Sequence, residues 1–218
     1  MIPTATESIT ARLSGRTPVR RLEGRNATKA DVLVYDLDGT RVAVKDYGGR
    51  GVLARNAIGR FLVSRECRAY EAAGRVPGLA TFLGRVGPYA LATAWIEAQP
   101  LSARLGEILP AETFDRLDAI LAALHAKGVA LADLHHRDVL LDAGGGVHVV
   151  DLAAAVVGGP FFARAAAQDR LAAARIRARF TGIPEAEALA RLDPASVRMW
   201  RLGRRAKGIL NRLRGKKS

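Results

Sequence analysis

The amino-acid sequence predicts an α+β fold, with a small antiparallel sheet in the first half of the chain and helices in the second. Short valine-rich segments bounded by Gly, Asp and Pro recur over residues 19–97, which is typical of antiparallel strands. After Pro100, apolar residues recur at helical spacing. Hydrophobic residues make up 49% of the 218 residues, which is enough to build a core.

Five strands and one helix are expected in the first half. Residues 1–18 are polar and lack periodicity, so we expect a flexible lead-in there. The expected strands lie in the segments VRRLEG, ADVLVYDL, TRVAVKDY, LATFLGRV and YALATAWIE. Tight turns are expected at Asp38-Gly39 and at Gly87-Pro88. Between the third and fourth strands, apolar residues at helical spacing predict a helix over about residues 52–73.

Residues 129–151 carry three aspartates around a predicted hairpin. The segment DAGGG at residues 142–146 supplies the turn, because glycine accepts positive φ. Asp138 and Asp151 then meet at the open end of the hairpin, and Asp133 precedes it. Carboxylates arranged in this way are suited to hold a divalent cation.

The rest of the second half is expected to be helical. The predicted helices cover residues 111–127, 162–180, 184–192 and 194–214. From residue 194 on, the chain has nine Lys or Arg residues and no acidic residue. A basic amphipathic helix of this kind can lie on an anionic membrane surface. The alternative is a helix that docks on the second half with its basic face in water. Nucleic-acid binding is not favoured, because no aromatic residues interleave with the charges.

Lys45, at the end of the strand-like VAVK, needs an anionic partner if it is buried. Glu66 and Glu71 on the following helix are both candidates, and Glu66 is preferred because it is nearer the middle of the helix. Taken alone, without the other motifs, Lys45 would be interpreted as a strand-end lysine that extends into water.

Together these motifs resemble the protein-kinase-like phosphotransferase superfamily, whose parts are a V-A-I-K lysine, a helix glutamate, an H-R-D loop and a D-F-G aspartate. The resemblance covers roughly residues 19–155. It implies a compact bilobal fold with a five-stranded antiparallel N-lobe that carries one helix and a reduced helical C-lobe. The implied division is a lead-in (1–18), an N-lobe (19–97), a C-lobe (98–193) and a basic tail (194–218).

By this resemblance, Lys45 would hold the α- and β-phosphates of ATP, with Glu66 as its ion-pair partner. Asp133, in the segment LADLHHRD, would accept the proton of the substrate hydroxyl. Asp151 and Asp138 would face Mg²⁺. The cofactors implied are therefore ATP and Mg²⁺.

The chain departs from the family pattern at the glycine-rich loop. Between Leu22 and Val32 the only glycine is Gly24, so Asn26, Thr28 and backbone amides would have to cover the phosphates.

Other departures lie in and near the loop with Asp133. Asp138 stands where the family has asparagine, and it could be a metal ligand or only a structural hydrogen-bonding group. His135 matches the D-x-H pattern of small-molecule and lipopolysaccharide-type kinases, where it would orient the loop or touch phosphate. Leu131 replaces the histidine of H-R-D. Glu97 marks the expected hinge, whose backbone groups would bind adenine.

The segment after Asp151 bears on the acceptor. No A-P-E motif follows it, and residues 152–180 contain no Ser, Thr or Tyr, so activation-loop phosphorylation is excluded there. This favours a hydroxyl of a lipid or lipid-linked sugar as acceptor, and the sequence looks closest to small bacterial lipopolysaccharide-core or Kdo-type kinases. Two alternatives stay open: a minimal Ser/Thr protein kinase, and a pseudokinase scaffold that performs no chemistry.

A cytoplasmic location is expected, with peripheral association to the inner membrane through the basic tail. The single cysteine, Cys67, excludes an intrachain disulfide and suits a reducing compartment. The N-terminus lacks the apolar region of a signal peptide, and no apolar run approaches the roughly 18 residues of a spanning helix.

Overall fold

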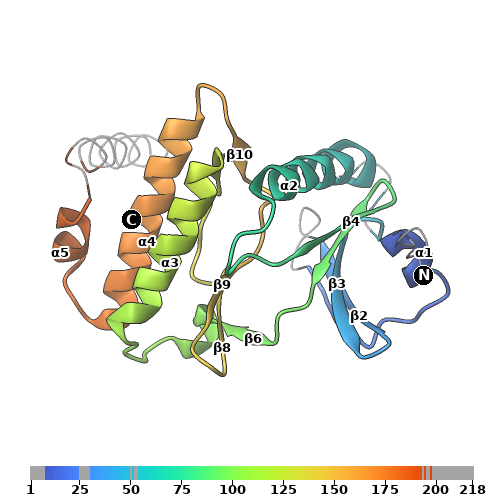
Figure 1. Cartoon of the computed structure of the whole chain (residues 1–218), viewed down its shortest axis with the longest axis horizontal. Helices are drawn as coiled ribbons and strands as arrows, with labels where there is room; N and C mark the ends of the chain where they lie inside the picture. The colour runs from blue at the N-terminus through green and yellow to red at the C-terminus, as the bar shows by residue number, and fades with distance from the viewer. Residues whose placement is uncertain are drawn as a thin grey trace, which may run out of the picture.

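The computed structural model describes residues 8–24, 30–49, 51, 54–192, 194 and 197. It is a mixed α+β structure whose largest sheet has five antiparallel strands in the order β1-β2-β3-β5-β4 (Figure 1). The strands are β1 (Arg20–Leu22), β2 (Asp31–Leu37), β3 (Thr40–Asp46), β4 (Phe82–Val86) and β5 (Ala90–Ala94). The five-stranded antiparallel sheet predicted from the valine-rich segments is thus confirmed.

One helix packs on this sheet. A π-helical turn, η1 (Ala54–Gly59), leads into α2 (Arg60–Ala73), so the α-helix itself begins later than the pattern predicts. The buried face of α2 contacts the sheet, where the ring of Tyr70 stacks on Phe82 with centroids 5.4 Å apart. This contact fixes the position of α2 along its own axis relative to the sheet, and therefore the position of its polar residues.

The flexible lead-in predicted for residues 1–18 is wrong for one stretch. Residues Ile9–Leu13 form a short helix, α1, which Ser8 caps by accepting a hydrogen bond from the amide of Ala11 at 3.3 Å. Ile9 is buried in an apolar cluster with Leu37, Val42, Val44, Ala90 and Ala92. A five-residue helix that is held by one apolar side chain has too few residues to show a periodicity in the sequence.

The second half is built on two long helices. The helices there are α3 (Ala111–Ala126), α4 (Phe162–Thr181) and α5 (Glu185–Ala190), preceded by the 3₁₀ turn η2 (Leu101–Arg104). Their ends lie within two residues of the predicted ones. The expected helix over residues 194–214 lies outside the described residues, apart from two isolated positions.

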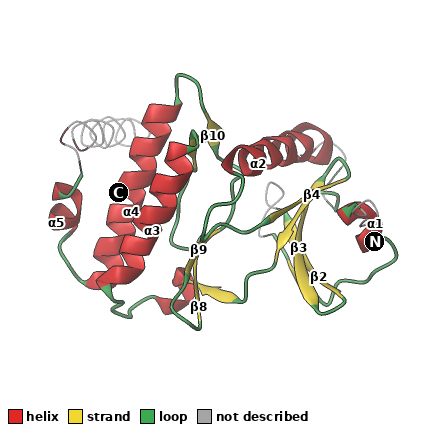
Figure 2. Ribbon diagram, viewed as in Figure 1, coloured by secondary structure: helices red, strands yellow, loops and turns green. Residues whose placement is uncertain are grey.

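Short strands connect the two halves. They are β6 (Ala98–Pro100), β7 (Val129–Ala130), β8 (Val139–Asp142), β9 (Val147–Val149) and β10 (Val156–Val157). β6, β8 and β9 form one small sheet, and β7 pairs with β10. Figures 1 and 2 show this strand cluster between the five-stranded sheet and the pair α3–α4. The sequence predicts β8 and β9, but β6, β7 and β10 are too short to give a pattern.

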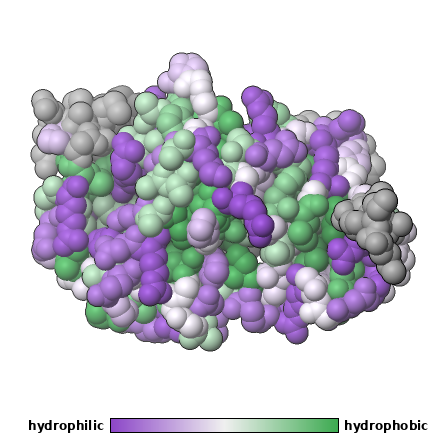
Figure 3. All heavy atoms as spheres, viewed as in Figure 1, coloured by the Kyte–Doolittle hydropathy of each residue, from purple (hydrophilic) through white to green (hydrophobic). Residues whose placement is uncertain are grey.

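One hydrophobic core runs through both halves. It includes Tyr47, Val63 and Tyr70 beside the five-stranded sheet, and Leu117 and Leu152 on the helical side. On the face drawn in Figure 3, hydrophilic and hydrophobic residues are interspersed. In the described part of the chain, no helix is both long and apolar enough to cross a membrane.

Candidate functional site

The hairpin β8–β9 brings two of the predicted aspartates together. Its turn is held by Asp142, whose Oδ1 accepts hydrogen bonds from the amides of Gly144 and Gly146 at 2.9 and 2.7 Å. At the other end, the amide of Val150 donates to the carbonyl of Asp138 at 2.9 Å. The predicted hairpin is confirmed, and Asp138 and Asp151 lie at its open end.

Asp151 has a backbone conformation that few aspartates adopt. Its φ is 70°, in the left-handed region. This conformation costs free energy in a residue other than glycine, and residues that adopt it cluster at functional sites. Its Oδ1 accepts a hydrogen bond from Lys45 Nζ at 2.8 Å and one from the amide of Ala153 at 3.2 Å. The strained backbone thus directs the carboxylate toward the five-stranded sheet.

Lys45 on β3 lies between two carboxylates. Its Nζ is 2.8 Å from Glu66 Oε2 on α2 and 2.8 Å from Asp151 Oδ1. The second oxygen of Glu66 accepts from the amide of Leu152 at 3.2 Å, so Glu66 joins sheet, helix and hairpin. Of the two candidate glutamates, Glu66 is the buried partner of Lys45, whereas Glu71 is exposed. The predicted ion pair is therefore present.

The lysine remains charged in this setting. Burial by itself lowers the pKa of Lys45, but the neighbouring carboxylates of Glu66 and Asp151 more than reverse this and raise it. The result is a fixed positive charge with only 17% of the side chain exposed, next to a carboxylate that is 30% exposed. A fixed ammonium at the edge of a site is suited to contact phosphate oxygens.

Asp138 is half-buried near Asp151. Burial, and then the charge of Asp151, raise the pKa of the Asp138 carboxyl to about 6. Two carboxylates that destabilise each other's charge form a pair that a divalent cation would stabilise, and oxygen is the ligand that Mg²⁺ prefers. In the described residues, no group of three or more His, Cys, Asp or Glu side chains is arranged to hold a metal ion. The pair of Asp138 and Asp151 therefore has no third ligand of these types there.

Asp133 lies on the loop between β7 and β8 and is mostly exposed. Its Oδ1 is 3.3 Å from His135 Nε2, and its side chain is 63% exposed. The amide of His135 donates to Asp138 Oδ2 at 3.1 Å, which ties the loop to the open end of the hairpin. The structure therefore places Asp133, Asp138 and His135 in one short loop.

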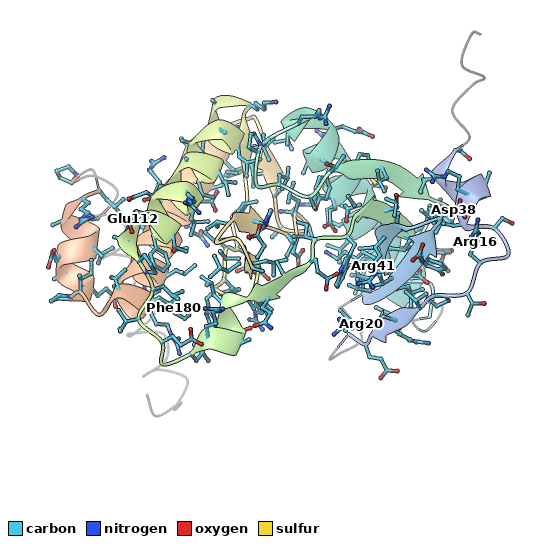
Figure 4. All side chains as sticks on the ribbon, turned by 60° about the horizontal axis from the view of Figure 1, so that its bottom comes forward. Arg16, Arg20, Asp38, Arg41, Glu112 and Phe180 are labelled. Carbon is cyan, nitrogen blue, oxygen red and sulfur yellow. The ribbon has the colours of Figure 1, made fainter. Side chains whose placement is uncertain are left out.

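His136, the next histidine in the loop, packs near the end of α4. The ring of His136 lies 6.2 Å from that of Phe180 on α4, the residue labelled in Figure 4. Burial lowers the pKa of His136, and the nearby charges of Arg179 and Arg137 lower it further. The charges of Arg137 and Arg179 therefore both act on the imidazole of His136.

Sequence reasoning missed Asp169, which holds the loop from behind. This fully buried carboxylate on α4 accepts from the amides of Leu131 and Ala132 at 2.7 and 2.8 Å, and contacts His125 Nε2 at 3.0 Å. Ala132 has a φ of 64°, a strained conformation that these hydrogen bonds stabilise. The sequence contains a pattern that indicates a buried carboxylate here. Asp169 is the only acid among residues 162–180, and alanines three and four residues away share its helix face.

Arg65 was also missed. Its Nε donates to the carbonyl of Ala155 at 3.0 Å and its Nη2 donates to that of Ala154. Arg65 precedes Glu66 on α2, so the helix is fastened to the segment that follows Asp151. No sequence pattern indicates a contact between an arginine and backbone carbonyls 90 residues away.

The other predicted site residues are further from this cluster or not described. Glu97 Oε2 accepts hydrogen bonds from Arg41 Nη1 at 2.8 Å and from Trp95 Nε1 at 2.9 Å, which ties the segment between β5 and β6 to the sheet. Arg41 and Arg20 lie at this side of the sheet (Figure 4). Asn26 and Thr28 lie outside the described residues.

The arrangement joins a fixed ammonium, two crowded carboxylates and an exposed aspartate on an adjoining loop. These groups can bind phosphate and a cation and can accept a proton. No model of a protein family matches the chain, and no curated protein matches its sequence. The chemical interpretation therefore depends on the residues themselves.

Proposed function

We propose that the protein is a Mg-ATP-dependent phosphotransferase with a protein-kinase-like arrangement. In this proposal, residues 19–97 form an N-lobe and residues 98–193 a reduced helical C-lobe. The observation that supports it most is the position of Lys45, 2.8 Å from both Glu66 and Asp151, although these residues come from β3, α2 and the segment after β9.

Each group then has a definite task in phosphoryl transfer, which depends mainly on positioning and neutralisation of charge. Lys45, oriented by Glu66, would contact phosphate oxygens of ATP. Asp151 and Asp138 would supply oxygen ligands to Mg²⁺, which neutralises phosphate charge when bound. Asp133 would accept the proton of the acceptor hydroxyl, and its exposure leaves room for an acceptor to approach.

The acceptor proposed is a hydroxyl of a lipid-linked sugar or another envelope lipid. Only ten residues separate Asp151 from the start of α4, and this segment contains no Ser, Thr or Tyr. A segment this short offers little surface for docking an extended peptide. The basic tail supports a substrate at an anionic membrane surface.

A second candidate is a pseudokinase scaffold that binds a partner without catalysis. The observation that favours it is the pair of acids, Asp138 and Asp151, where the family pattern has one acid and one amide. A thermal-shift titration with ADP, with and without Mg²⁺, separates the two. The enzyme should be stabilised by ADP and more so with Mg²⁺, whereas no shift under either condition supports the scaffold.

The decisive experiment is transfer of label from ATP in the presence of lipid extract or, separately, protein extract. The wild-type protein should label the lipid fraction; label in protein instead would support a minimal Ser/Thr protein kinase. Asp133→Asn should lower transfer by about 10²-fold or more, because it removes the proton acceptor. It should keep the thermal shift with Mg-ADP.

The matched control is Asp38→Asn. Asp38 is exposed in the β2–β3 turn with a φ of 57°, a conformation that asparagine tolerates well. This variant should retain wild-type transfer. Full activity of Asp133→Asn would contradict the assignment of Asp133.

A further inference from the structure

Two exposed arginines, one in the loop that carries Asp133 and one on α4, have no hydrogen bond or ion pair with a described residue. Arg137 lies in the same loop, and Arg179 lies in the last turn of α4. Two neighbours on α4 differ: Arg175 pairs with Glu185, and Arg177 is buried between Asp115 and Asp118. The contrast distinguishes Arg137 and Arg179 from arginines that stabilise the fold.

The loop that carries Asp133 also carries Arg137 and packs on α4 one residue from Arg179. The amide of Asp138 donates to the carbonyl of His135 at 2.9 Å, so residues 135–138 form a tight turn with Arg137 inside it. His135 reaches back to Asp133 at 3.3 Å. His136 packs near Phe180, which follows Arg179 in the chain. The contact between His136 and Phe180 thus brings the turn to the end of α4, where Arg137 and Arg179, the chain neighbours of these two rings, are both exposed.

We propose that Arg137 and Arg179 form a binding site for an anionic group, a phosphate or carboxylate, carried by the acceptor molecule. Guanidinium groups match the planar oxygen pairs of these anions and bind them through charge-assisted hydrogen bonds. With the anion held beside the loop, the acceptor hydroxyl would face Asp133; this part of the inference rests on the proposed function. Binding of the anion itself does not.

The charges favour an anionic acceptor over a neutral one. In the segment between β7 and β8, Asp133 is the exposed carboxylate and Asp138 is half-buried, whereas Arg137 in this segment and Arg179 on α4 are both exposed. Unpaired charges of one sign raise the local concentration of oppositely charged ligands. A neutral sugar could only accept ordinary hydrogen bonds from them, whereas a phosphorylated or carboxylated sugar would form charge-assisted pairs.

Inorganic phosphate is the probe for a direct binding test on the full chain. Its titration is followed by NMR through the backbone amide signals of residues 133–137, in the presence of saturating Mg-ADP. Phosphate should shift these signals saturably. Arg137→Ala and Arg179→Ala should each weaken binding by about three-fold, as expected for one exposed charge pair, and Arg137→Glu with Arg179→Glu should abolish it.

The matched control is Arg164→Ala. Arg164 is exposed on the first turn of the same helix, about 20 Å from Arg179 by helical rise, and pairs with no described residue. It should leave phosphate binding unchanged. An equal loss in Arg164→Ala, or no saturable binding by the wild-type protein, would overturn the inference, since the effect would then be one of overall charge or absent.

Transfer from labelled ATP provides the second readout. The Arg137→Glu, Arg179→Glu protein should need at least ten-fold more extract for half-maximal labelling, with an unchanged KM for ATP. Label in the organic phase indicates an anionic lipid headgroup, and label in the aqueous phase a free anionic sugar. Phosphate binding without any transfer would contradict the proposed function but leave the anion site standing; equal labelling by wild type and variant would overturn the acceptor role.

Discussion

At the scale of single residues, the protonation of Asp138 makes the stability of the fold depend on pH. Its carboxyl pKa of about 6 in the folded protein exceeds the value of about 3.9 for an unfolded chain. Between these values the folded protein binds more protons than the unfolded chain, so its stability falls as pH rises through this window. Above it, the folded protein carries the full cost of a half-buried charge beside Asp151.

Asp138→Asn removes this cost and keeps an oxygen that can accept from the His135 amide. Without Mg²⁺, we expect the free energy of unfolding at pH 7.5 to rise by about 1–3 kcal/mol, with no gain at pH 3.5. Urea denaturation at the two pH values measures the difference. An equal change at both would show that packing, not titration, distinguishes the variant.

Phosphoryl transfer by Asp138→Asn should become poorer, although the variant is more stable. If Asp138 is a metal ligand, Asp138→Asn exchanges an anionic ligand for a neutral one, so more Mg²⁺ should be required for half-maximal transfer. A variant that is more stable and binds Mg²⁺ more weakly is the combination expected of a functional site.

At the scale of elements, Arg65 fastens α2 to the chain after Asp151. Arg65→Gln cannot span both carbonyls of Ala154 and Ala155, so α2 and the hairpin should lose their fixed separation. We expect kcat to fall about ten-fold, because small displacements of reacting groups are costly. Hydrogen exchange at residues 153–157 should become faster, which checks the effect without activity.

Arg68→Gln is the control for this prediction. Arg68 lies about one turn further along α2, is exposed, and is not fastened to the segment after Asp151. It should leave both kcat and exchange at residues 153–157 unchanged. If Arg65→Gln behaved in the same way, α2 would be held by its apolar face alone.

The elements also show which parts of the site are predictable. The strands and the hairpin follow from alternation and from glycine turns, which are local. Glu66 could be chosen over Glu71 because it lies nearer the middle of the predicted helix, and in the structure Glu66 is the buried one. Asp169 and Arg65 contact backbone groups about 40 and 90 residues away, and only the packing of α4 and α2 determines those contacts. Backbone groups are the same at every residue, so they leave no mark in the sequence.

At the scale of the whole molecule, the basic tail can be tested by removal. A chain ending at Leu192 lacks nine Lys or Arg residues. We expect it to lose binding to phosphatidylglycerol vesicles, since each basic residue near such a surface contributes about 1 kcal/mol. Co-sedimentation with vesicles measures this, with phosphatidylcholine vesicles as control.

Thermal unfolding of the same truncated chain tests the alternative for the tail. A helix docked on the second half would contribute to stability, so its removal would lower Tm by several degrees. An unchanged Tm with lost vesicle binding supports the membrane role. Retained vesicle binding would contradict it.

The buried contacts of Asp169 have a consequence for synthesis on the ribosome. The loop amides of Leu131 and Ala132 find their acceptor 38 and 37 residues later, and Lys45 meets Asp151 only 106 residues after its own incorporation. Because N-terminal segments emerge first, the five-stranded sheet can pair while the loop is still without its support. A nascent chain released before Asp169 is incorporated would therefore carry Asp133 but lack the carboxylate that holds the strained backbone of Ala132, and we expect such a fragment to be inert.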